Sequence, residues 1–579
     1  MPEQVSYPTP ASARSTRLPA WLVLPLAAAA LVVMRLHAFG LPLEPDECNY
    51  AYIGSRLLAG DRLYVDVWDH QPPAVFALFA AVSAIFGEGT LVFRVMSLLF
   101  SLASLMLIYD IARRQTGPFG AGVAAIAFAL LSSDIGTAGE GCNREIYMNT
   151  FLLAALAALS RSTQAPEHSS RAKLAHEPTA NEAGSGLRTQ DSGLSPVAIA
   201  GLLLGIASAL KPVVAVQWLA LAIWIAWGAA RRNGARGAVT TVILFGLGPA
   251  LVWLGHFAWF AATSRLDEFV DAVFRFNIGY AGAKTSGLGR FVAFFREGKR
   301  LDIFPSAAPL WLAGLLALAA LGALAARRRA ARPAKASFDG ALMAYALGSY
   351  AAVCLPGHSW PHYYYLLIPP LVLVVAATFG RLSNATVPQP FSLYAKPRSE
   401  RLWRTLAVVW LGLVAIWQVR HYLLVPTLTL TDTRYASRDL WGWVQGLNVA
   451  SVTDPDDCVL VIGSDPGVYY YAKRRCATRY TMMTGLDAQH PDHVERRANV
   501  MADLQRHRPR LILVIDPAFP ELHRFIVENY VQASPQFIDF HDERPTEPVM
   551  QALMDRTRPV APIDWNWHRR SVHEGGPRS

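Results

Sequence analysis

Charged residues are scarce in this 579-residue chain: Asp, Glu, Lys and Arg make up 17% of it, whereas 53% is hydrophobic. Soluble proteins carry about 25% charged residues, so the composition argues against a large soluble protein. The net charge of +10 comes from short basic clusters between apolar segments rather than from one long basic block. It therefore gives no indication of a nucleic-acid-binding surface, and the chain is predicted to be a polytopic α-helical membrane protein.

Two common site signatures are also missing. The turn GSDPG from Gly463 follows an apolar run but lacks the spaced glycines of a dinucleotide-binding motif. Glu47, His70, His358 and His362 supply oxygen and nitrogen donors, yet no tight ligand spacing relates them. A divalent metal cation therefore stays an open alternative rather than an expected cofactor.

Apolar segments recur between residues 18 and 424 and predict about eleven transmembrane helices, several of them short for a bilayer. They run Leu18–Val33, Leu91–Ile111, Phe119–Leu131, Ile146–Leu159, Pro196–Leu210, Val213–Ala230, Ala238–Ala262, Ile303–Ala325, Gly340–Leu355, Tyr363–Phe379 and Trp403–Leu424. A polar tail, residues 1–17, precedes the first, so a cleaved signal peptide is one alternative. A retained signal anchor is expected, because no clear small-residue cleavage site follows.

The basic clusters predict the orientation of these helices. When Pro73–Phe86 is not counted as a span, the clusters fall on one side, which the positive-inside rule makes the cytoplasm. They include Arg113 and Arg114, Arg231 to Arg236, Arg327 to Arg329, and Lys396 to Arg404. Pro73–Phe86 is then predicted to lie as a juxtamembrane helix in the outer interface.

Three further segments complete the expected organisation. Residues 161–196 are predicted to be a disordered cytoplasmic loop. Residues 264–300 are predicted to form a basic external loop. Two explanations of its positive charge have equal weight: a loop of this length has little influence on topology, or the loop covers a site for a phosphate-bearing ligand. Residues 425–579 are predicted to form a small extracytoplasmic α/β domain, with strands in CVLVIGSD and RLILVID and a helix over 493–506.

On this topology, ionisable side chains gather at the outer membrane face. Asp46 and Glu47 lie in the first external loop, residues 41–90, and Glu145 lies in the second. The other members are Arg94, Lys211, His70, His358 and His362. Each alone has an ordinary explanation, such as a solvated carboxylate, a snorkelling lysine or an interface aromatic belt. Their coincidence on one face predicts chemistry on a charged lipid headgroup.

The first external loop carries a resemblance to a known family. The run from DECNYAYIGSRLLAG to LVFRV, residues 46–95, resembles the corresponding loop of bacterial family 39 glycosyltransferases. These are GT-C membrane enzymes related to protein O-mannosyltransferases and to the lipid A aminoarabinose transferase. The matching positions are Asp46-Glu47, Tyr50, Gly60-Asp61, Pro72-Pro73, Gly87 and Arg94. The similarity extends over roughly the first four hundred residues and includes Glu145, Lys211 and the run PHYYYLLIPP from Pro361.

The resemblance implies a GT-C fold over 18–424 and an inverting transfer of a sugar from a polyprenyl-phosphate donor. The acceptor would be a hydroxyl of an envelope glycan, lipid or protein, outside the inner (cytoplasmic) membrane. Asp46 would be the catalytic base, and Glu47 and Glu145 would support it, position the acceptor or bind a cation. Lys211 and Arg94 would bind the donor phosphate.

Further contacts and one departure follow from the same resemblance. Candidate contacts to donor, acceptor or metal are Tyr50, His70, His358, His362 and Tyr363. Several relatives have a lysine where this chain has Gln71, which shifts the expected phosphate binding toward Lys211 and Arg94.

All five cysteines map to the outer side or its edge, a compartment that is oxidising in many bacteria. We expect one disulfide between Cys48 and Cys142, joining the two carboxylate-bearing loops, and another between Cys458 and Cys476. Free thiols are the alternative, because sequence cannot fix connectivity.

Two other functions compete with a transferase. A transporter or flippase for a charged lipid or glycan would also place charges in a membrane protein, but it should show two repeated halves, and none is recognisable. A receptor-like scaffold would leave the carboxylates without a role, so that Asp46→Asn would preserve its function.

Overall fold

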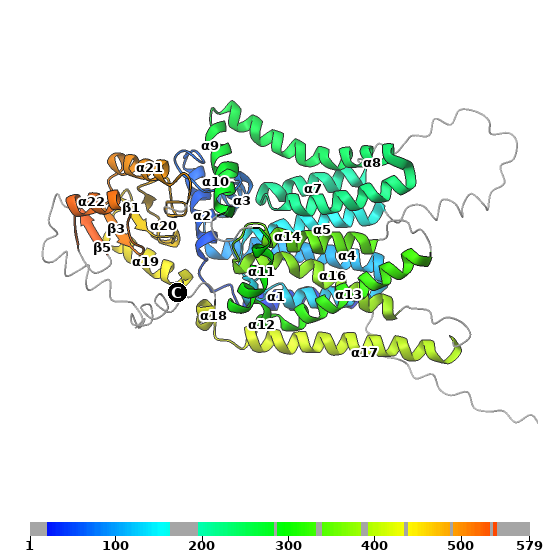
Figure 1. The fold of residues 1–579 in the computed structure, drawn as a ribbon. Coiled ribbons are helices and arrows are strands. Elements are labelled where there is room, and N and C mark those ends of the chain that lie inside the picture. The colour runs from blue at the N-terminus through cyan, green and yellow to red at the C-terminus, as the bar shows by residue number, and fades with distance from the viewer. Residues whose placement is uncertain are drawn as a thin grey trace, which may run out of the picture.

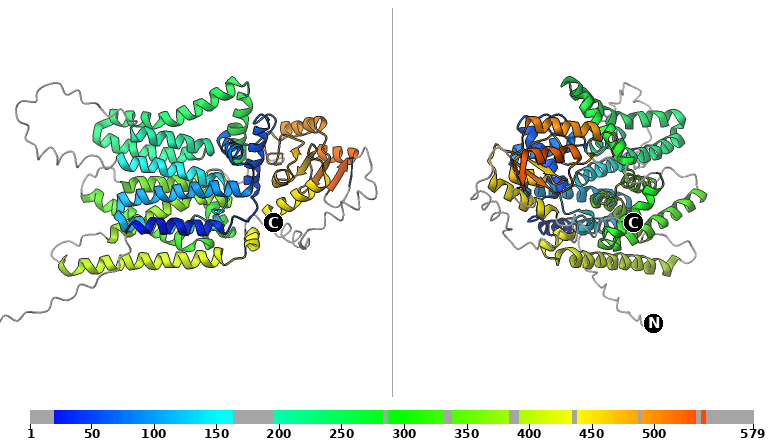
Figure 2. Two further views of the ribbon diagram at one scale, coloured as in Figure 1. Left: turned by 180° about the vertical axis from the view of Figure 1, so that it is seen from behind. Right: turned by 60° about the vertical axis from the view of Figure 1, so that its left-hand side comes forward.

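The computed structural model describes residues 20–162, 195–282, 287–331, 338–383, 392–433, 438–486, 490–532 and 537–540. Long helices lie side by side in one bundle, and a smaller α/β unit covers one end of it (Figures 1 and 2). The predicted tail 1–17 and most of the predicted loop 161–196 lie outside the described residues.

The bundle is built from the apolar segments predicted above, all of which are helical. Its helices are α1 (Ala20–Leu36), α4 (Thr90–Leu131), α5 (Arg144–Ser162), α7 (Pro196–Leu210), α8 (Val214–Ala262), α13 (Ala308–Ala331), α14 (Phe338–Cys354), α16 (Ile368–Ser383) and α17 (Ser392–Gln418). Among the described residues, 4 helices are long and apolar enough to cross a membrane: Thr90–Leu131, Val214–Ala262, Pro361–Ser383 and Glu400–Leu423.

Two of the long helices fold back on themselves, so each supplies two of the predicted segments. In α4 the break is at Gly117, with φ 78°, and in α8 it is at Gly234, with φ 68°. Both angles lie in the left-handed region that glycine adopts without a steric penalty. Arginines lie close to both breaks, and the turn of α8 lies at the end of the bundle away from the α/β unit (Figure 1).

Glycines allow α7 and α8 to approach closely. A Cβ atom at Gly201 would lie 2.2 Å from the Phe245 carbonyl oxygen, and one at Gly248 would lie 2.1 Å from the Leu202 nitrogen. Small residues are the usual means of bringing helix backbones together in membranes, where no hydrophobic effect drives helices against each other. These glycines therefore set how closely α7, which ends directly before Lys211, packs against α8.

Short helices gather at the end of the bundle nearest the α/β unit. They are α2 (Pro45–Leu58), α3 (Pro73–Phe86), η1 (Ile135–Thr137), α9 (Leu266–Val270), η2 (Asp271–Arg275), α10 (Phe276–Gly282), α11 (Gly289–Arg300), α12 (Ile303–Ser306), α15 (Pro361–Tyr364), η3 (Tyr365–Leu367), η4 (Val419–Leu423) and α18 (Thr427–Thr433). The expected helix at Pro73–Phe86 is therefore present, and its place in the membrane interface stays a prediction. Helix α2 was not predicted, although Pro45 at its start and the Glu44–Glu47 capping box are recognisable helix signals.

The α/β unit contains a five-stranded sheet in the order β2-β1-β3-β5-β4. Strand β1 is parallel to β2 and β3, whereas β5 is antiparallel to β3 and β4. Its elements are α19 (Arg438–Val452), β1 (Cys458–Ile462), α20 (Gly467–Ala472), β2 (Arg475–Cys476), α21 (His493–Arg506), β3 (Leu511–Val514), α22 (Pro520–Asn529), β4 (Tyr530–Gln532) and β5 (Phe537–Phe540). The predicted strands and the helix over 493–506 are confirmed.

Direct hydrogen bonds fix the α/β unit to α2. The Cys476 amide donates to the Tyr52 hydroxyl at 2.8 Å, and the Thr481 hydroxyl donates to the Asn49 side-chain oxygen at 2.6 Å. Both contacts are buried. Because α2 also carries Asp46, these contacts set the position of the α/β unit relative to that carboxylate.

The predicted disulfides are wrong, because all five cysteines are free thiols. The Cys48 thiol donates to the Leu43 carbonyl oxygen at 3.4 Å, within its own loop, and the Cys142 amide instead binds the Glu47 carboxylate. The Cys476 thiol lies 3.6 Å from the Thr478 hydroxyl. Hydrogen bonds to loop and strand atoms, rather than covalent bonds, therefore hold these segments together.

We expect all five thiols to react with an alkylating reagent after denaturation without reductant. Mass spectrometry of the denatured protein should show five alkyl groups, whereas the native protein should be largely protected because most of these thiols are buried. A peptide in which Cys48 and Cys142 remain joined would contradict the structure.

Candidate active site

The first turn of α2 separates two neighbouring carboxylates. Pro45 starts the helix, and the Glu44 and Glu47 side chains cap its free amides. Successive residues of an α-helix point about 100° apart, so Asp46 and Glu47 face different surroundings. Asp46 keeps 35% of its side chain exposed to a cavity, whereas the Glu47 side chain is fully buried.

The cavity beside Asp46 has a volume of about 190 Å³ and lies where α2, α5, α10, α15 and the α/β unit meet. Carboxylates, cations, imidazoles and aromatic rings line it. The lining residues include Glu44, Asp46, Tyr50, Asp69, His70, Gln71, Arg144, Tyr280, Trp360, His362, Tyr363, Arg438, Ser464 and Thr484. Sequence positions more than four hundred residues apart therefore share one polar site.

A chain of ionisable groups leads from the cavity into the protein. The His362 Nε2 atom lies 3.7 Å from Asp46 Oδ2 and 4.0 Å from Glu145 Oε1. Glu145 Oε1 in turn accepts a 2.6 Å hydrogen bond from Lys211 Nζ, which lies 3.2 Å from the centre of the Tyr363 ring. The structure thus brings together Asp46, Glu145, Lys211, His362 and Tyr363, as the sequence predicts.

Arg144 was missed by the sequence analysis, although it adjoins Glu145. Its side chain is buried against the cavity, with its Nε atom 3.6 Å from Glu145 Oε1 and its guanidinium carbon 5.7 Å from the centre of the Tyr50 ring. Within the described part of the chain, Nε and Nη1 have no hydrogen-bond partner. A buried guanidinium with free donors is suited to binding an oxyanion.

The cavity lining also holds a carboxylate that the sequence analysis missed, Asp69. It accepts hydrogen bonds from the Asn49 side chain and from the Gln71 amide, the latter at 2.9 Å, and His70 Nδ1 lies 3.3 Å away. Burial raises the pKa of Asp69 to about 7. The adjacent His70 was the only signal for it in the sequence, and the His70 ring contacts Gln71 in the cavity wall.

Glu47 and Arg94 occupy different places from those predicted. Their side chains form a fully buried ion pair, with Arg94 Nη1 3.3 Å from Glu47 Oε2, and Arg94 Nη2 donates to the Pro42 carbonyl oxygen. Glu47 also accepts from the Cys142 amide, which joins the first external loop to the second. Neither side chain lines the cavity that contains Asp46.

The basic segment 264–300 does not place its described arginines in this cavity. Arg290 donates to the carbonyl oxygens of Leu355 and Ala281, and Arg275 pairs with Asp267. The segment instead contributes Tyr280, against which the His358 ring stacks at 4.0 Å. His358 thus supports the wall without lining the cavity itself. Among the described residues, no cluster of three or more His, Cys, Asp or Glu side chains could hold a metal ion.

Comparisons with known proteins agree with this architecture. The sequence profile described as dolichyl-phosphate-mannose-protein mannosyltransferase matches residues 70–172. No curated protein matches the sequence significantly. The fold is similar to that of ArnT from Cupriavidus metallidurans bound to undecaprenyl phosphate, at 16% identity and a TM-score of 0.55, covering 90% of this chain and 98% of that one.

A second similar structure is the oligosaccharyltransferase of Archaeoglobus fulgidus in its apo form. It has 12% identity and a TM-score of 0.53, and the match covers 87% of this chain and 70% of that one. The resemblance recognised in the first external loop is thus confirmed at the level of fold. The chain is an integral membrane protein with the GT-C fold, and the comparisons indicate a glycosyltransferase.

Proposed function

We propose that this protein is an inverting glycosyltransferase that moves a sugar from a polyprenyl-phosphate donor to an acceptor hydroxyl outside the cytoplasmic membrane. One observation carries the proposal: a single cavity has the partly exposed carboxylate of Asp46 beside the buried guanidinium of Arg144. A base and an anion site at one cavity are what displacement of a phosphate by a hydroxyl requires.

Asp46 would act as the base in this reaction. Its carboxylate accepts the proton of the acceptor hydroxyl, whose oxygen forms the new bond to the anomeric carbon as the bond to the phosphate oxygen breaks. His362 lies within 3.7 Å of the same carboxylate and keeps it oriented toward the cavity. Attack on the face opposite the leaving phosphate inverts the anomeric centre.

The leaving polyprenyl phosphate would be bound by Arg144, with Lys211 as a further cation behind it. Lys211 stays paired with Glu145, so its main effect is to hold that carboxylate and to add positive potential around the cavity. Gln71 lines the same cavity at the position where several relatives have lysine, and it offers an amide instead of a charge. Arg144 therefore takes the largest share of the phosphate's charge.

An apolar groove near this site could take the prenyl chain. The groove, about 530 Å³ in volume, is lined by α11, α13, α14 and α16 residues that include Phe294, Trp311 and Tyr350. Phe294 stacks on Tyr364 at 4.7 Å, and Tyr364 follows Tyr363 of the cavity wall. A lipid chain in the groove would thus end beside the polar cavity. A similar structure, that of the archaeal oligosaccharyltransferase AglB from Archaeoglobus fulgidus, is in complex with an inhibitory peptide and a dolichol-phosphate.

The proposed topology has eleven membrane-spanning helices, with α3 in the outer interface and the α/β unit outside the cell membrane. The arginines at the two folded-back turns, near Gly117 and Gly234, would face the cytoplasm, in agreement with the positive-inside rule. The catalytic cavity at the opposite end then meets donor and acceptor at the outer face.

The reaction is tested most simply by its lipid product. Membranes containing the protein are incubated with polyprenyl-linked sugars extracted from a strain that lacks it, together with envelope acceptors from the same strain. We expect release of free polyprenyl phosphate that depends on the protein. Donor that stays intact in the presence of protein and acceptor would contradict a transferase.

The acid limb of the pH profile gives a second test. Burial raises the pKa of Asp46, Glu145 adds to this effect and Arg144 opposes it. Because the base must be ionised, kcat/KM should fall as the pH drops through this raised pKa, above the ordinary aspartate value of about 3.9. Activity that remains constant down to about pH 4 would contradict the assignment of Asp46 as the base.

A further inference from the structure

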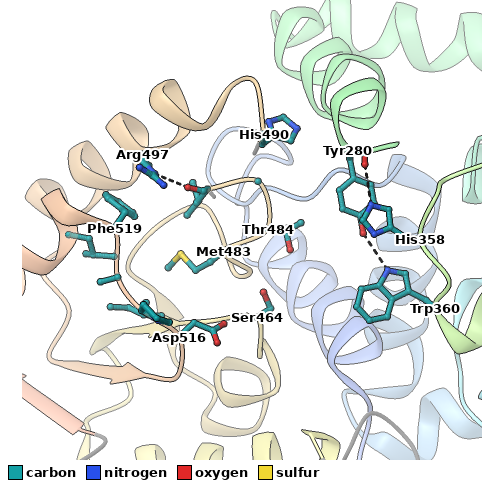
Figure 3. Close-up of a pocket in the computed structure, with 16 residues that line it drawn as sticks. Tyr280, His358, Trp360, Ser464, Met483, Thr484, His490, Arg497, Asp516 and Phe519 are labelled. Atoms are coloured by element: carbon teal, nitrogen blue, oxygen red, sulfur yellow. Dashed lines mark hydrogen bonds between the residues drawn. The ribbon is translucent and has the colours of Figure 1, made fainter. Parts of the chain in front are cut away.

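A second, larger cleft lies between the α/β unit and the bundle, with a volume of about 520 Å³ (Figure 3). Part of its lining lies at the carboxyl ends of two parallel strands. This part consists of Ile462, the last residue of β1, with Ser464, and of Asp516 to Phe519 after β3. Figure 3 shows Tyr280, His358 and Trp360 on the opposite side of the cleft from Asp516 and Phe519.

The cleft occupies a defined point in the sheet topology. From β1 the chain runs through α20 to β2 on one side of β1, and then through α21 to β3 on the other side. The strand order therefore reverses between β1 and β3. In open α/β sheets, ligands bind outside the carboxyl ends of the strands at such a switch point.

The polar groups of the cleft are available to a ligand. The side chains of Ser464, Thr484 and Asp516 form no hydrogen bond with any other residue that the structure describes, and all three line the cleft. Gly463, with φ 151°, lets the turn after β1 pass close to Ile515, where a Cβ would lie 3.0 Å from the Ile515 side chain. The Ser464 hydroxyl and the Asp516 carboxylate thus lie just after β1 and β3, and the Thr484 hydroxyl lies in the loop after β2, all without internal partners.

Aromatic rings form much of the remaining wall. Trp360 donates from its Nε1 atom to the Tyr280 hydroxyl at 3.3 Å, and Phe519 packs against the Arg497 guanidinium at 5.1 Å. The apolar faces of sugar rings pack against aromatic rings, whereas their hydroxyls bond to carboxylates and hydroxyls. The combination of aromatic rings with hydroxyls and a carboxylate suits a carbohydrate better than a lipid chain.

The cleft is continuous with the catalytic cavity. Tyr280, Trp360, Ser464 and Thr484 line both. A chain of sugars lying in the cleft would therefore lead to the cavity that contains Asp46. Because the cleft adjoins the α/β unit, its ligand would enter from the side of the bundle that carries this unit (Figure 1).

We infer that this cleft is the binding site for a carbohydrate acceptor, with Asp516 and the aromatic walls holding the sugar units that precede the reacting hydroxyl. The inference rests on the transferase activity proposed above. It names the acceptor class as a glycan, or the glycan part of a glycolipid, and it gives the α/β unit a role in selecting that acceptor.

The test uses the purified full-length protein and the unmodified envelope acceptor isolated from a strain lacking it. Asp516→Ala removes a hydrogen-bonding group from the cleft, and Ala518→Trp fills it. Loss of one hydrogen bond to a charged group should raise KM for the acceptor by about tenfold, with kcat and the donor KM unchanged. Asp456→Ala, which removes an exposed carboxylate elsewhere on the α/β unit, is the matched control and should leave all three constants unchanged.

The outcomes separate this inference from the proposed function. If the wild type transfers sugar and both cleft variants keep the wild-type acceptor KM, the cleft assignment is overturned and the transferase stands. If the acceptor that loses its sugar in the deletion strain is a polypeptide, the carbohydrate assignment is overturned. If the wild type transfers nothing, the proposed function and the acceptor site are overturned together.

Discussion

Asp46→Asn is expected to lower sugar transfer by roughly 10²- to 10⁴-fold, the usual contribution of a general base. The amide cannot accept the proton of the attacking hydroxyl, yet it keeps the size of the carboxylate and its position on α2. Because 35% of the side chain is exposed to the cavity, the substitution leaves no buried group unpaired and the protein should accumulate normally. Transfer is measured in cells as the yield of modified envelope glycan at equal protein level.

The matched control is Asp66→Asn, which changes the same residue type in the same external loop. The Asp66 carboxylate pairs with Arg62 at an exposed surface, and such pairs contribute little to stability. Its variant should behave as the wild type does. If Asp46→Asn retained most of the activity at normal protein level, the base would have to be another group, such as Asp69, whose carboxylate lines the same cavity.

Arg144→Gln is expected to reduce transfer by roughly 10²- to 10³-fold, comparable to removing one donor from a preorganised anion site. The reason is that Nε and Nη1 have no hydrogen-bond partner among the described residues, so both are available to the leaving phosphate. The variant loses the buried contact between Arg144 and Glu145, but Glu145 keeps its 2.6 Å hydrogen bond from Lys211, so the melting temperature should fall less than in Arg94→Gln. The measurements are the transfer rate and the melting temperature of the detergent-solubilised protein.

Arg94→Gln provides the contrasting variant. It removes one partner of a fully buried ion pair and leaves the Glu47 charge uncompensated, which costs about 3–5 kcal/mol. We expect a clear drop in melting temperature and in yield. If Arg144→Gln were the destabilising substitution and Arg94→Gln the inactivating but stable one, the roles assigned to the two arginines would have to be exchanged.

The sequence predicts the parts of this fold that long apolar segments determine. Every predicted helix is present, and so are the strands at Cys458–Ile462 and Leu511–Val514. Strand β2 spans only Arg475–Cys476, which is too short for a periodic signal. Helix α2 mixes polar and apolar residues, although it is buried from Glu47 to Gly54, and it lies between apolar segments, so hydropathy alone does not reveal it.

Site residues were predicted where the chain places an unusual side chain next to an apolar segment. Asp46, Glu145, Lys211 and His362 satisfy this condition and meet in space. Glu47 does not line the cavity, because helical geometry turns it about 100° away from Asp46. The role of Arg144 could not be predicted from the sequence, since only the observed start of α5 shows that its guanidinium is buried beside the cavity.

The central claim is that this protein transfers one sugar from a polyprenyl-phosphate donor to an envelope acceptor. The most direct test is mass spectrometry of both lipids and envelope glycans from a strain that lacks the protein, complemented with the wild type or with Asp46→Asn. The account predicts that one discrete sugar mass disappears from the envelope and that the corresponding polyprenyl-phosphate sugar accumulates, in the deletion strain and in the Asp46→Asn strain alike. An unchanged envelope, or full restoration by Asp46→Asn, would contradict it.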